Sequence, residues 1–412
     1  MNTRVVNAAL LDESGLWTVS LRNAQVGTVT RQTARVAPDG GALDAGGGLC
    51  VPALVDAHLH LDLAYALELP ADVLPVNESG TLLEAIRHWS AAKARLAAEN
   101  VRERAGRAIR DEVRAGTGYI RSHVDVGSAA GTRLCEGVLA AREAARDICR
   151  IELVAFPQDG LIRDPRAVDL VREALRAGVE LVGGIPHIER VPADGLAHLE
   201  RVFELAAEFD ADVDVHIDET DDPGSRYTEH LAALTISRGW QGRVTASHAC
   251  ALSSYDDVHA ARVIDLLAEA RIGVVTNPGV NLHLQGRFDR YPKRRGLTRV
   301  RELLARGVLC AAGQDCIRDP FYPLGNGCML DQAFLLVHAD HLSLPGQIRQ
   351  AFDMVGAMAG RVTGMRTTGV EPGAPADLAV FAAADVSELV RRRPAPLAVF
   401  HAGCRVQPDE GA

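Results

Sequence analysis

The feature that most constrains the fold of this chain is a regular alternation of short apolar runs with longer amphipathic segments between residues 49 and 312. The apolar runs have the length of buried strands. They predict strands over Leu49–Val55, Tyr119–Val126, Ile151–Phe156, Glu180–Ile185, Asp212–His216, Val244–His248, Ile272–Thr276 and Gly307–Ala312. Helix-length segments separate them, over Thr81–Ala98, Ala129–Arg146, Pro165–Ala177, Leu196–Phe209, Ser225–Arg238 and Asp256–Ala270. This rhythm predicts an α/β fold, a (β/α)8 TIM-like barrel. A doubly wound open sheet is the alternative, because periodicity alone does not close a barrel.

The two ends of the chain follow a different pattern. Before residue 50, short β-type runs at Val5–Leu10, Leu16–Leu21 and Gln25–Val29 are separated by turn residues. After residue 369 the chain again becomes β-like, at Asp377–Phe381 and Leu397–Phe400. We therefore expect residues 1–50 and 369–412 to form one small β-sandwich beside a barrel that spans residues 51–368.

The composition of the 412-residue chain narrows the classes of function. Its 44 Lys and Arg against 54 Asp and Glu give a net charge of -10, which argues against a partner as anionic as nucleic acid. No run reaches the roughly 18 apolar residues of a membrane-spanning helix, and the start of the chain does not resemble a secretory signal. The eight cysteines include no CxxC pair, which is typical of free thiols in the cytoplasm. We expect a cytoplasmic enzyme that acts on a small molecule.

The carboxyl ends of the predicted strands carry metal-binding side chains. Strand residues i and i+2 point the same way, so His58 and His60 can converge on one ion at the end of the first barrel strand. His216 ends the fifth strand, and Asp315 follows the eighth. Because catalysis in such barrels gathers at these strand ends, the four side chains are expected to meet. Three imidazoles and one carboxylate suit Zn²⁺ or Fe²⁺ and leave room for water.

These residues and several longer strings give the chain a family resemblance. It resembles the amidohydrolase superfamily, and within it the bacterial cytosine deaminases, over nearly its whole length. The resemblance is densest at residues 79–82, 121–126, 154–158, 184–187, 245–248, 281–296 and 322–325. It implies a barrel of the amidohydrolase type flanked by a β-sandwich of both chain ends, and a homo-oligomeric assembly.

The resemblance also assigns roles to particular residues. It implies one divalent ion, Fe²⁺ or Zn²⁺, whose ligands match His58, His60, His216 and Asp315. Two-metal relatives carry a carboxylated lysine on the fourth strand, and Glu180–Ile185 contains no lysine, which favours one ion. Gln158 would hydrogen-bond the amide edge of the substrate, and Glu219 and His248 would handle protons.

The implied reaction is hydrolytic deamination of a cytosine-type nucleobase to the uracil-type product and ammonia. A bound divalent ion would lower the pKa of its water to about 7. Asp315 and His248 would orient this water and take its proton, and Glu219 would protonate ring N3. Hydroxide would then add at C4, and the amine would leave as ammonia.

The chain departs from the family pattern near the substrate. Bacterial cytosine deaminases usually carry His-Asp-Asp after the eighth strand, whereas this chain has Gln314-Asp315-Cys316. Phe321 stands where tryptophan is common, and Leu82 is expected to line the pocket through its backbone. A thiol in place of a carboxylate near C5 removes a charge that a 5-substituent would have to desolvate. We therefore expect 5-methylcytosine to be accepted or preferred.

Other interpretations are weaker. His123 is more typical of a core histidine, or of one that supports the ligands from behind, than of a ligand, and the sequence does not settle its role. His187-Ile188-Glu189 matches half of another deaminase signature, whose P-C-x-x-C half is absent. Isocytosine and creatinine stay open as substrates, because one pocket residue shifts selectivity more easily than mechanism. A non-catalytic scaffold is disfavoured, because every expected metal ligand and proton-handling residue is present.

Overall fold

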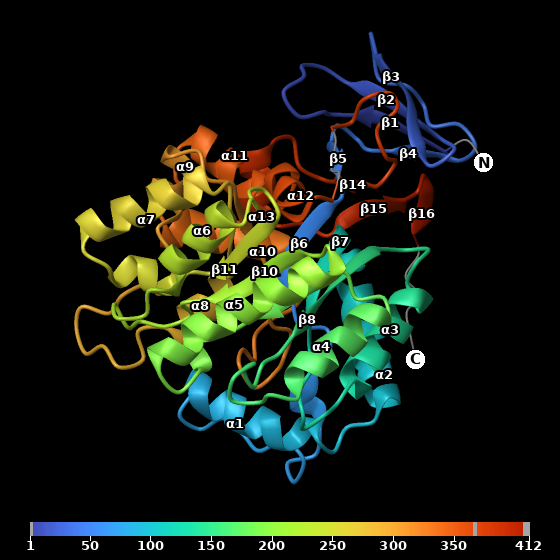
Figure 1. Cartoon of the computed structure of the whole chain (residues 1–412). Coiled ribbons are helices and arrows are strands. Elements are labelled where there is room, and N and C mark those ends of the chain that lie inside the picture. The colour runs from blue at the N-terminus through green and yellow to red at the C-terminus, as the bar shows by residue number, and fades with distance from the viewer. Residues whose placement is uncertain (1–2, 366–368, 407–412) are drawn as a thin grey trace.

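The computed structural model describes residues 3–365 and 369–406, and its centre is a sheet of eight parallel strands (Figure 1). The strands follow one another in chain order, each hydrogen-bonded to the next. They are β6 (Leu54–Leu59), β7 (Thr117–Asp125), β8 (Arg150–Phe156), β9 (Leu181–Gly184), β10 (Asp212–Ile217), β11 (Val244–His248), β12 (Gly273–Thr276) and β13 (Cys310–Ala312). Most of their residues are buried, as expected of strands covered on both faces.

Hydrogen bonds between the first and last strands close this sheet into a barrel. A parallel bridge joins Leu59 to Asp315, just past the end of β13. The amide of Asp315 donates to the carbonyl of His58 (2.7 Å), and the amide of His60 donates to the carbonyl of Asp315 (2.9 Å). The (β/α)8 barrel is thereby confirmed, and the open sheet is excluded.

Helices surround the barrel. They are α1 (Leu82–Lys93), α2 (Ala98–Arg114), α3 (Arg133–Ala144), α4 (Ala167–Arg176), α5 (Pro192–Phe209), α6 (Tyr227–Ser237), α7 (Asp257–Glu269), α8 (Pro278–Leu284), α9 (Val300–Ala305), α10 (Met329–Ala339), α11 (Pro345–Asp353), α12 (Ala357–Thr363) and α13 (Val386–Arg392). Short 3₁₀ turns are η1 (Ala66–Glu68), η2 (Pro186–Ile188) and η3 (Cys250–Ser254). Helix α2 lies outside the predicted segments, although Val101, Ala105 and Ile109 form its buried face. No helix in the described residues is long and apolar enough to cross a bilayer.

Two four-stranded sheets from the chain ends pack against each other beside the barrel, where Figure 1 shows blue and red strands together. One contains β1 (Thr3–Ala8), β2 (Trp17–Arg22), β3 (Gln25–Arg31) and β4 (Ala42–Asp44). The other contains β5 (Leu49–Pro52), β14 (Leu378–Phe381), β15 (Pro396–His401) and β16 (Cys404–Val406). Val5, Leu21, Leu378 and Phe400 belong to their shared apolar core.

The single strand expected over Leu49–Val55 is wrong, because this run forms parts of two strands. β5 pairs antiparallel with β14 in the small sheet, whereas β6 begins the barrel. The chain changes sheets after Pro52: the amide of Ala53 donates to the carbonyl of Asp377, and that of Leu54 to Gly116, both at 2.9 Å. The expected domain boundary at residue 50 therefore falls inside β5. Residues 366–368 and 407–412, which include the expected second boundary, lie outside the described residues.

Candidate active site

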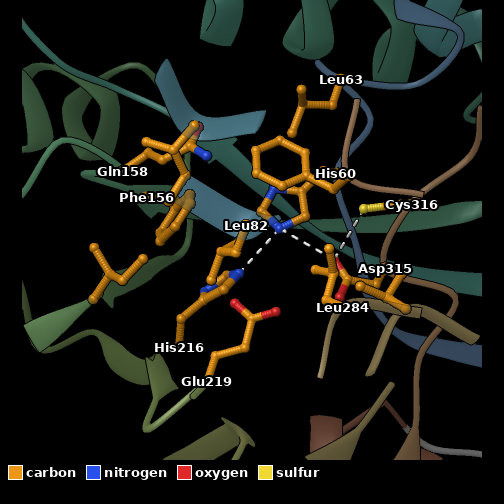
Figure 2. Close-up of a pocket in the computed structure, with 14 residues that line it drawn as sticks. His60, Leu63, Leu82, Phe156, Gln158, His216, Glu219, Leu284, Asp315 and Cys316 are labelled. Carbon is orange, nitrogen blue, oxygen red and sulfur yellow. Dashed lines mark hydrogen bonds and ion pairs between the residues drawn. The ribbon is translucent and has the colours of Figure 1, made fainter. Parts of the chain in front are cut away.

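His60, His216 and Asp315, three of the four expected metal ligands, lie together at the carboxyl end of the barrel (Figure 2). The fourth, His58, can share an ion with His60 and Asp315. His58 and His60 come from the end of β6, His216 from β10, and Asp315 from the segment after β13. His60 Nε2 lies 3.0 Å from His216 Nε2 and 3.5 Å from Asp315 Oδ1. His58 Nε2 lies 3.6 Å from the same carboxylate oxygen. Side chains from three separate strands therefore converge on one point.

The donor atoms of this cluster fit a divalent cation. His58 Nε2 and Asp315 Oδ2 are buried and have no hydrogen-bond partner. Burial lowers the pKa of His60 to about 3 and that of His58 and His216 well below the ordinary value. The imidazoles are thus neutral and offer lone pairs to an ion. Burial and the nearby Glu219 raise the pKa of Asp315 well above its ordinary value, and a bound cation would stabilise the negative charge of this carboxylate.

A short hydrogen-bonded chain orients His58. Its Nδ1 lies 2.9 Å from the Ser247 hydroxyl, which donates to Asp214 Oδ1 at 2.7 Å. Because the single hydroxyl proton goes to the carboxylate, His58 Nδ1–H is the donor in the other bond, and Nε2 keeps its lone pair for an ion. Sequence reasoning missed Ser247 and Asp214, although both belong to strands that already supplied candidate residues.

His123, whose role the sequence leaves open between a core residue, a residue that supports the ligands and a ligand, lies beside His58 and His216. Its ring centroid is 4.1 Å from that of His58, and its nitrogens can share an ion with those of His58 and His216. Both of its ring nitrogens are buried without a hydrogen-bond partner. The available signal was its place near the end of the second barrel strand, which by itself did not separate a ligand from a core residue.

Glu219 and His248 lie on the other side of Asp315. His248 Nδ1 is 3.5 Å from Glu219 Oε1, and His248 Nε2 is 3.8 Å from Asp315 Oδ2, so the imidazole bridges the two carboxyl groups. Burial raises the pKa of Glu219 to about 8, so this carboxyl group is largely protonated at neutral pH. It can therefore donate a proton, and the neutral His248 can accept one.

Three residues of this region have left-handed backbone conformations. The φ angles are 65° at Asp315, 72° at His248 and 48° at Asp218. Such values are uncommon for residues other than glycine and persist only where the surroundings hold them. At Asp218 the carboxylate accepts five hydrogen bonds, which come from Ser225, Tyr227, Thr228 and Tyr255. These bonds fix the backbone that carries Glu219.

A pocket next to the cluster brings the expected substrate residues together. Gln158, Cys316, Phe321 and Leu82 all line it, along with His60, His216, Glu219 and Asp315 (Figure 2). The remaining lining residues are apolar: Leu63, Ile86, Phe156, Ile185, Val280 and Leu284. Gln158 Oε1 is buried without a partner, which leaves it available to a ligand. The Cys316 thiol is neutral, because burial and the charge of Asp315 raise its pKa.

A wider outer chamber adjoins this pocket and shares Leu82, Glu219 and Leu284 with it. His187 lines the chamber, and both of its ring nitrogens are buried without a partner. Phe288 is 87% exposed at the rim. His187 ends one of the strings that carry the family resemblance, but no role near the site was assigned to it.

A closed (β/α)8 barrel with histidines and an aspartate clustered at its carboxyl end defines a class of hydrolases. The chain belongs to that class, the Amidohydrolase family, whose model matches residues 41–405. Family membership and the cluster together show a barrel able to hold a metal ion.

Individual relatives are similar to the chain over most of its length. The chain is similar to the solved structure of 5-methylcytosine deaminase from Klebsiella pneumoniae liganded with 5-fluorocytosine, with 36% identity and a TM-score of 0.93, covering 100% of this chain and 98% of that one. Pterin deaminase of Rhizobium rhizogenes is 33% identical over 86% of this chain and 80% of its own length. N-isopropylammelide isopropyl amidohydrolase of Pseudomonas sp. is 31% identical over 82% of this chain and 81% of its own length.

Proposed function

We propose that the protein deaminates a cytosine-type nucleobase hydrolytically and accepts a 5-substituent such as methyl. The observation that carries this proposal is the pocket in which an unpartnered Gln158 amide oxygen and the small neutral thiol of Cys316 line the same space as Glu219. Similarity to 5-methylcytosine deaminase supports the same substrate class.

Gln158 would recognise the substrate through its amide group. A primary amide has both a donor and an acceptor, so it can pair with the N–H and C=O of a pyrimidinone edge. Its buried oxygen lacks a partner in the protein, so a ligand without a matching N–H would leave it unpaired. Phe156, which stacks on His216 with ring centroids 4.1 Å apart, supplies a flat apolar wall beside this amide.

The residues that handle protons would act in the sequence of steps that deamination requires. A divalent ion held by His58, His60, His216 and Asp315 would activate the attacking water. Glu219, protonated because of its raised pKa, would donate to ring N3 and make C4 electrophilic. His248 spans the gap between Asp315 and Glu219, so a proton taken up beside Asp315 can return to Glu219 for the departing amine. Water is consumed and ammonia is released.

Cys316 and Phe321 would set the preference at C5. Cys316 is 2% exposed, and its Sγ lies 3.5 Å from Asp315 Oδ1, so the side chain stands at the pocket wall next to the cluster. A carboxylate there would have to lose its hydration when a methyl group approached. Burying a methyl group against a thiol and a phenyl ring instead stabilises the complex by about 0.8 kcal/mol.

The test compares kcat/KM for 5-methylcytosine and cytosine in wild type and Cys316→Asp. Wild type is expected to favour 5-methylcytosine, and Cys316→Asp to lower the ratio of the two constants about tenfold, since a charge is placed against the methyl group. Cys316→Ser should keep the preference because it stays small and neutral. Cys328→Ala, which does not line the pocket, is the control. A wide margin for cytosine in wild type would contradict the proposal.

A second candidate substrate is a bicyclic amino-heterocycle such as a pterin. The outer chamber favours it, because a second ring could extend past Leu82 and Leu284 toward the unpartnered nitrogens of His187. Ammonia release should be measured with cytosine, 5-methylcytosine, isocytosine, creatinine and pterin. A higher kcat/KM for pterin than for either cytosine, reduced by His187→Ala, would favour this candidate over the first.

A further inference from the structure

A fully buried lysine lies close to Gln158 and has no part in the proposed chemistry. Lys93 is the last residue of α1, and its side chain is completely buried. Its Nζ lies 2.6 Å from Asp125 Oδ2 and 2.6 Å from Asp159 Oδ2. Burial alone would lower the pKa of Lys93, but the two carboxylates outweigh it and raise the pKa, so the ammonium stays charged.

This ion triad joins three elements at the carboxyl end of the barrel. Asp125 ends β7, Asp159 lies three residues past the end of β8, and Lys93 ends α1. Ser90, on the same helix, adds a hydrogen bond of 2.8 Å from its hydroxyl to Asp159 Oδ1. The helix is therefore fixed at its carboxyl end to the segment that follows β8.

Gln158 belongs to that segment. The backbone amide of Gln158 donates to the carbonyl of Phe156 (3.0 Å), and the backbone amide of Gly160 donates to the carbonyl of Pro157 (2.9 Å). Residues 156–160 therefore form a tight turn. Asp159 directs its carboxylate to Lys93, while its neighbour Gln158 lines the pocket. The same triad also sets the far end of the helix whose first two turns contribute Leu82 and Ile86 to the pocket.

We propose that Lys93 is a positioning residue that holds the Gln158 turn, through Asp159, in the orientation that reads the amide edge of the substrate. This inference rests on the proposed function, because it assumes that Gln158 pairs with that edge. Removing the ammonium would leave two carboxylates close together without a cation, and the more exposed Asp159, whose side chain is 26% exposed, would turn toward water. Gln158 would move with it.

The experiment measures discrimination as the ratio of kcat/KM for cytosine to kcat/KM for 4-aminopyrimidine, which lacks the N1–H and C2=O groups. Lys93→Met should lower this ratio about tenfold, with a larger rise in KM for cytosine than fall in kcat, because one hydrogen-bonded contact is weakened. Asp159→Asn, which keeps the Lys93–Asp125 pair, should lower it in the same direction with little loss of stability. In a Gln158→Ala background, Lys93→Met should leave the ratio unchanged.

Leu378→Ala, in the core of the β-sandwich, is the control for lost stability: it should lower the Tm and leave the ratio as in wild type. The assignment is overturned if Gln158→Ala lowers the ratio while Lys93→Met and Asp159→Asn do not. It is also overturned if Lys93→Met acts equally with and without Gln158. Failure of the proposed function looks different, because wild type then releases no ammonia from cytosine or 5-methylcytosine.

Discussion

At the scale of single residues, burial determines which groups of the site are neutral. The imidazoles of His58, His60 and His216 are neutral because burial opposes their charged form. Glu219 keeps its proton for the same reason. One physical cause, the loss of hydration, thus gives lone pairs on one side of the pocket and an acid on the other.

Because the lone-pair donors and the acid are different residues, their substitutions should affect metal binding and turnover differently. His216→Ala and Asp315→Ala should each lose both the bound metal and turnover, since each removes a ligand from a four-residue set. Glu219→Gln should keep the metal and lose about 10²–10⁴-fold in kcat, because the amide fills the same space but cannot donate the proton. Metal analysis and ammonia release, measured on the same samples, check both results. Full activity in His216→Ala would refute the ligand assignment.

The candidate residues that could be predicted are those whose spacing shows in the sequence. His58 and His60 share one side of a strand because they are two residues apart, and Glu219 closely follows His216. The contacts of Lys93 and Ser247 could not be predicted. They depend on how neighbouring strands and helix α1 are aligned, and a single sequence does not contain that alignment.

At the scale of elements, the closing seam between β6 and β13 determines the site. The bonds that close the barrel are made by the backbones of His58, His60 and Asp315, so the seam and the metal cluster share residues. Gly313 permits the close approach. A Cβ atom at this position would lie 2.5 Å from Asn277 Oδ1 and 2.6 Å from His58 Cβ.

Gly313→Ala should therefore damage the cluster and the barrel together. We expect a loss of about 1–3 kcal/mol in the free energy of unfolding from overpacking, and weaker metal binding because His58 is displaced. Gly346→Ala is the matched control, since a Cβ there meets nothing within 4 Å. Urea unfolding and metal titration of both variants test the expectation. Equal metal affinity in the two variants would contradict it.

The order of strands and helices along the chain was largely predictable, whereas the strands with which each one pairs were not. Apolar runs indicated the barrel strands from β7 to β13, but the run at residues 49–55 divides between two sheets at Pro52 and overlaps β6 only at residues 54–55. Helix α2 escaped prediction because its sequence is rich in charged residues, and only a narrow face of it is buried.

At the scale of the whole molecule, the barrel contains several buried carboxyl groups whose pKa values are raised. Burial raises the pKa of Asp319 from 3.8 to about 7, although the amides of Phe321 and Tyr322 donate to its Oδ1. Because the pKa of Asp319 is higher in the folded protein than in the unfolded chain, the contribution of this group to stability is complete below pH 3.8. It is lost as the pH rises through 7.

Asp319→Asn should flatten the dependence of stability on pH. The side-chain oxygen of asparagine can still accept from both amides, but the group no longer titrates. Between pH 5 and pH 8, the free energy of unfolding of wild type should fall by about 2–3 kcal/mol more than that of the variant. Urea unfolding at the two pH values, at equal metal loading, gives this difference. An equal fall in the free energy of unfolding of wild type and Asp319→Asn would show that Asp319 is ionised at both pH values.

The position of Asp315 has a consequence for biosynthesis. The three imidazoles of the ligand set lie within residues 58–216, whereas the carboxylate that completes it follows the last barrel strand. A chain still on the ribosome therefore contains the three imidazoles, but not yet the carboxylate, while roughly the final third of the barrel is translated. The proposed set of four ligands is complete only when the segment after β13 docks against β6, the first barrel strand, in the same event that closes the barrel.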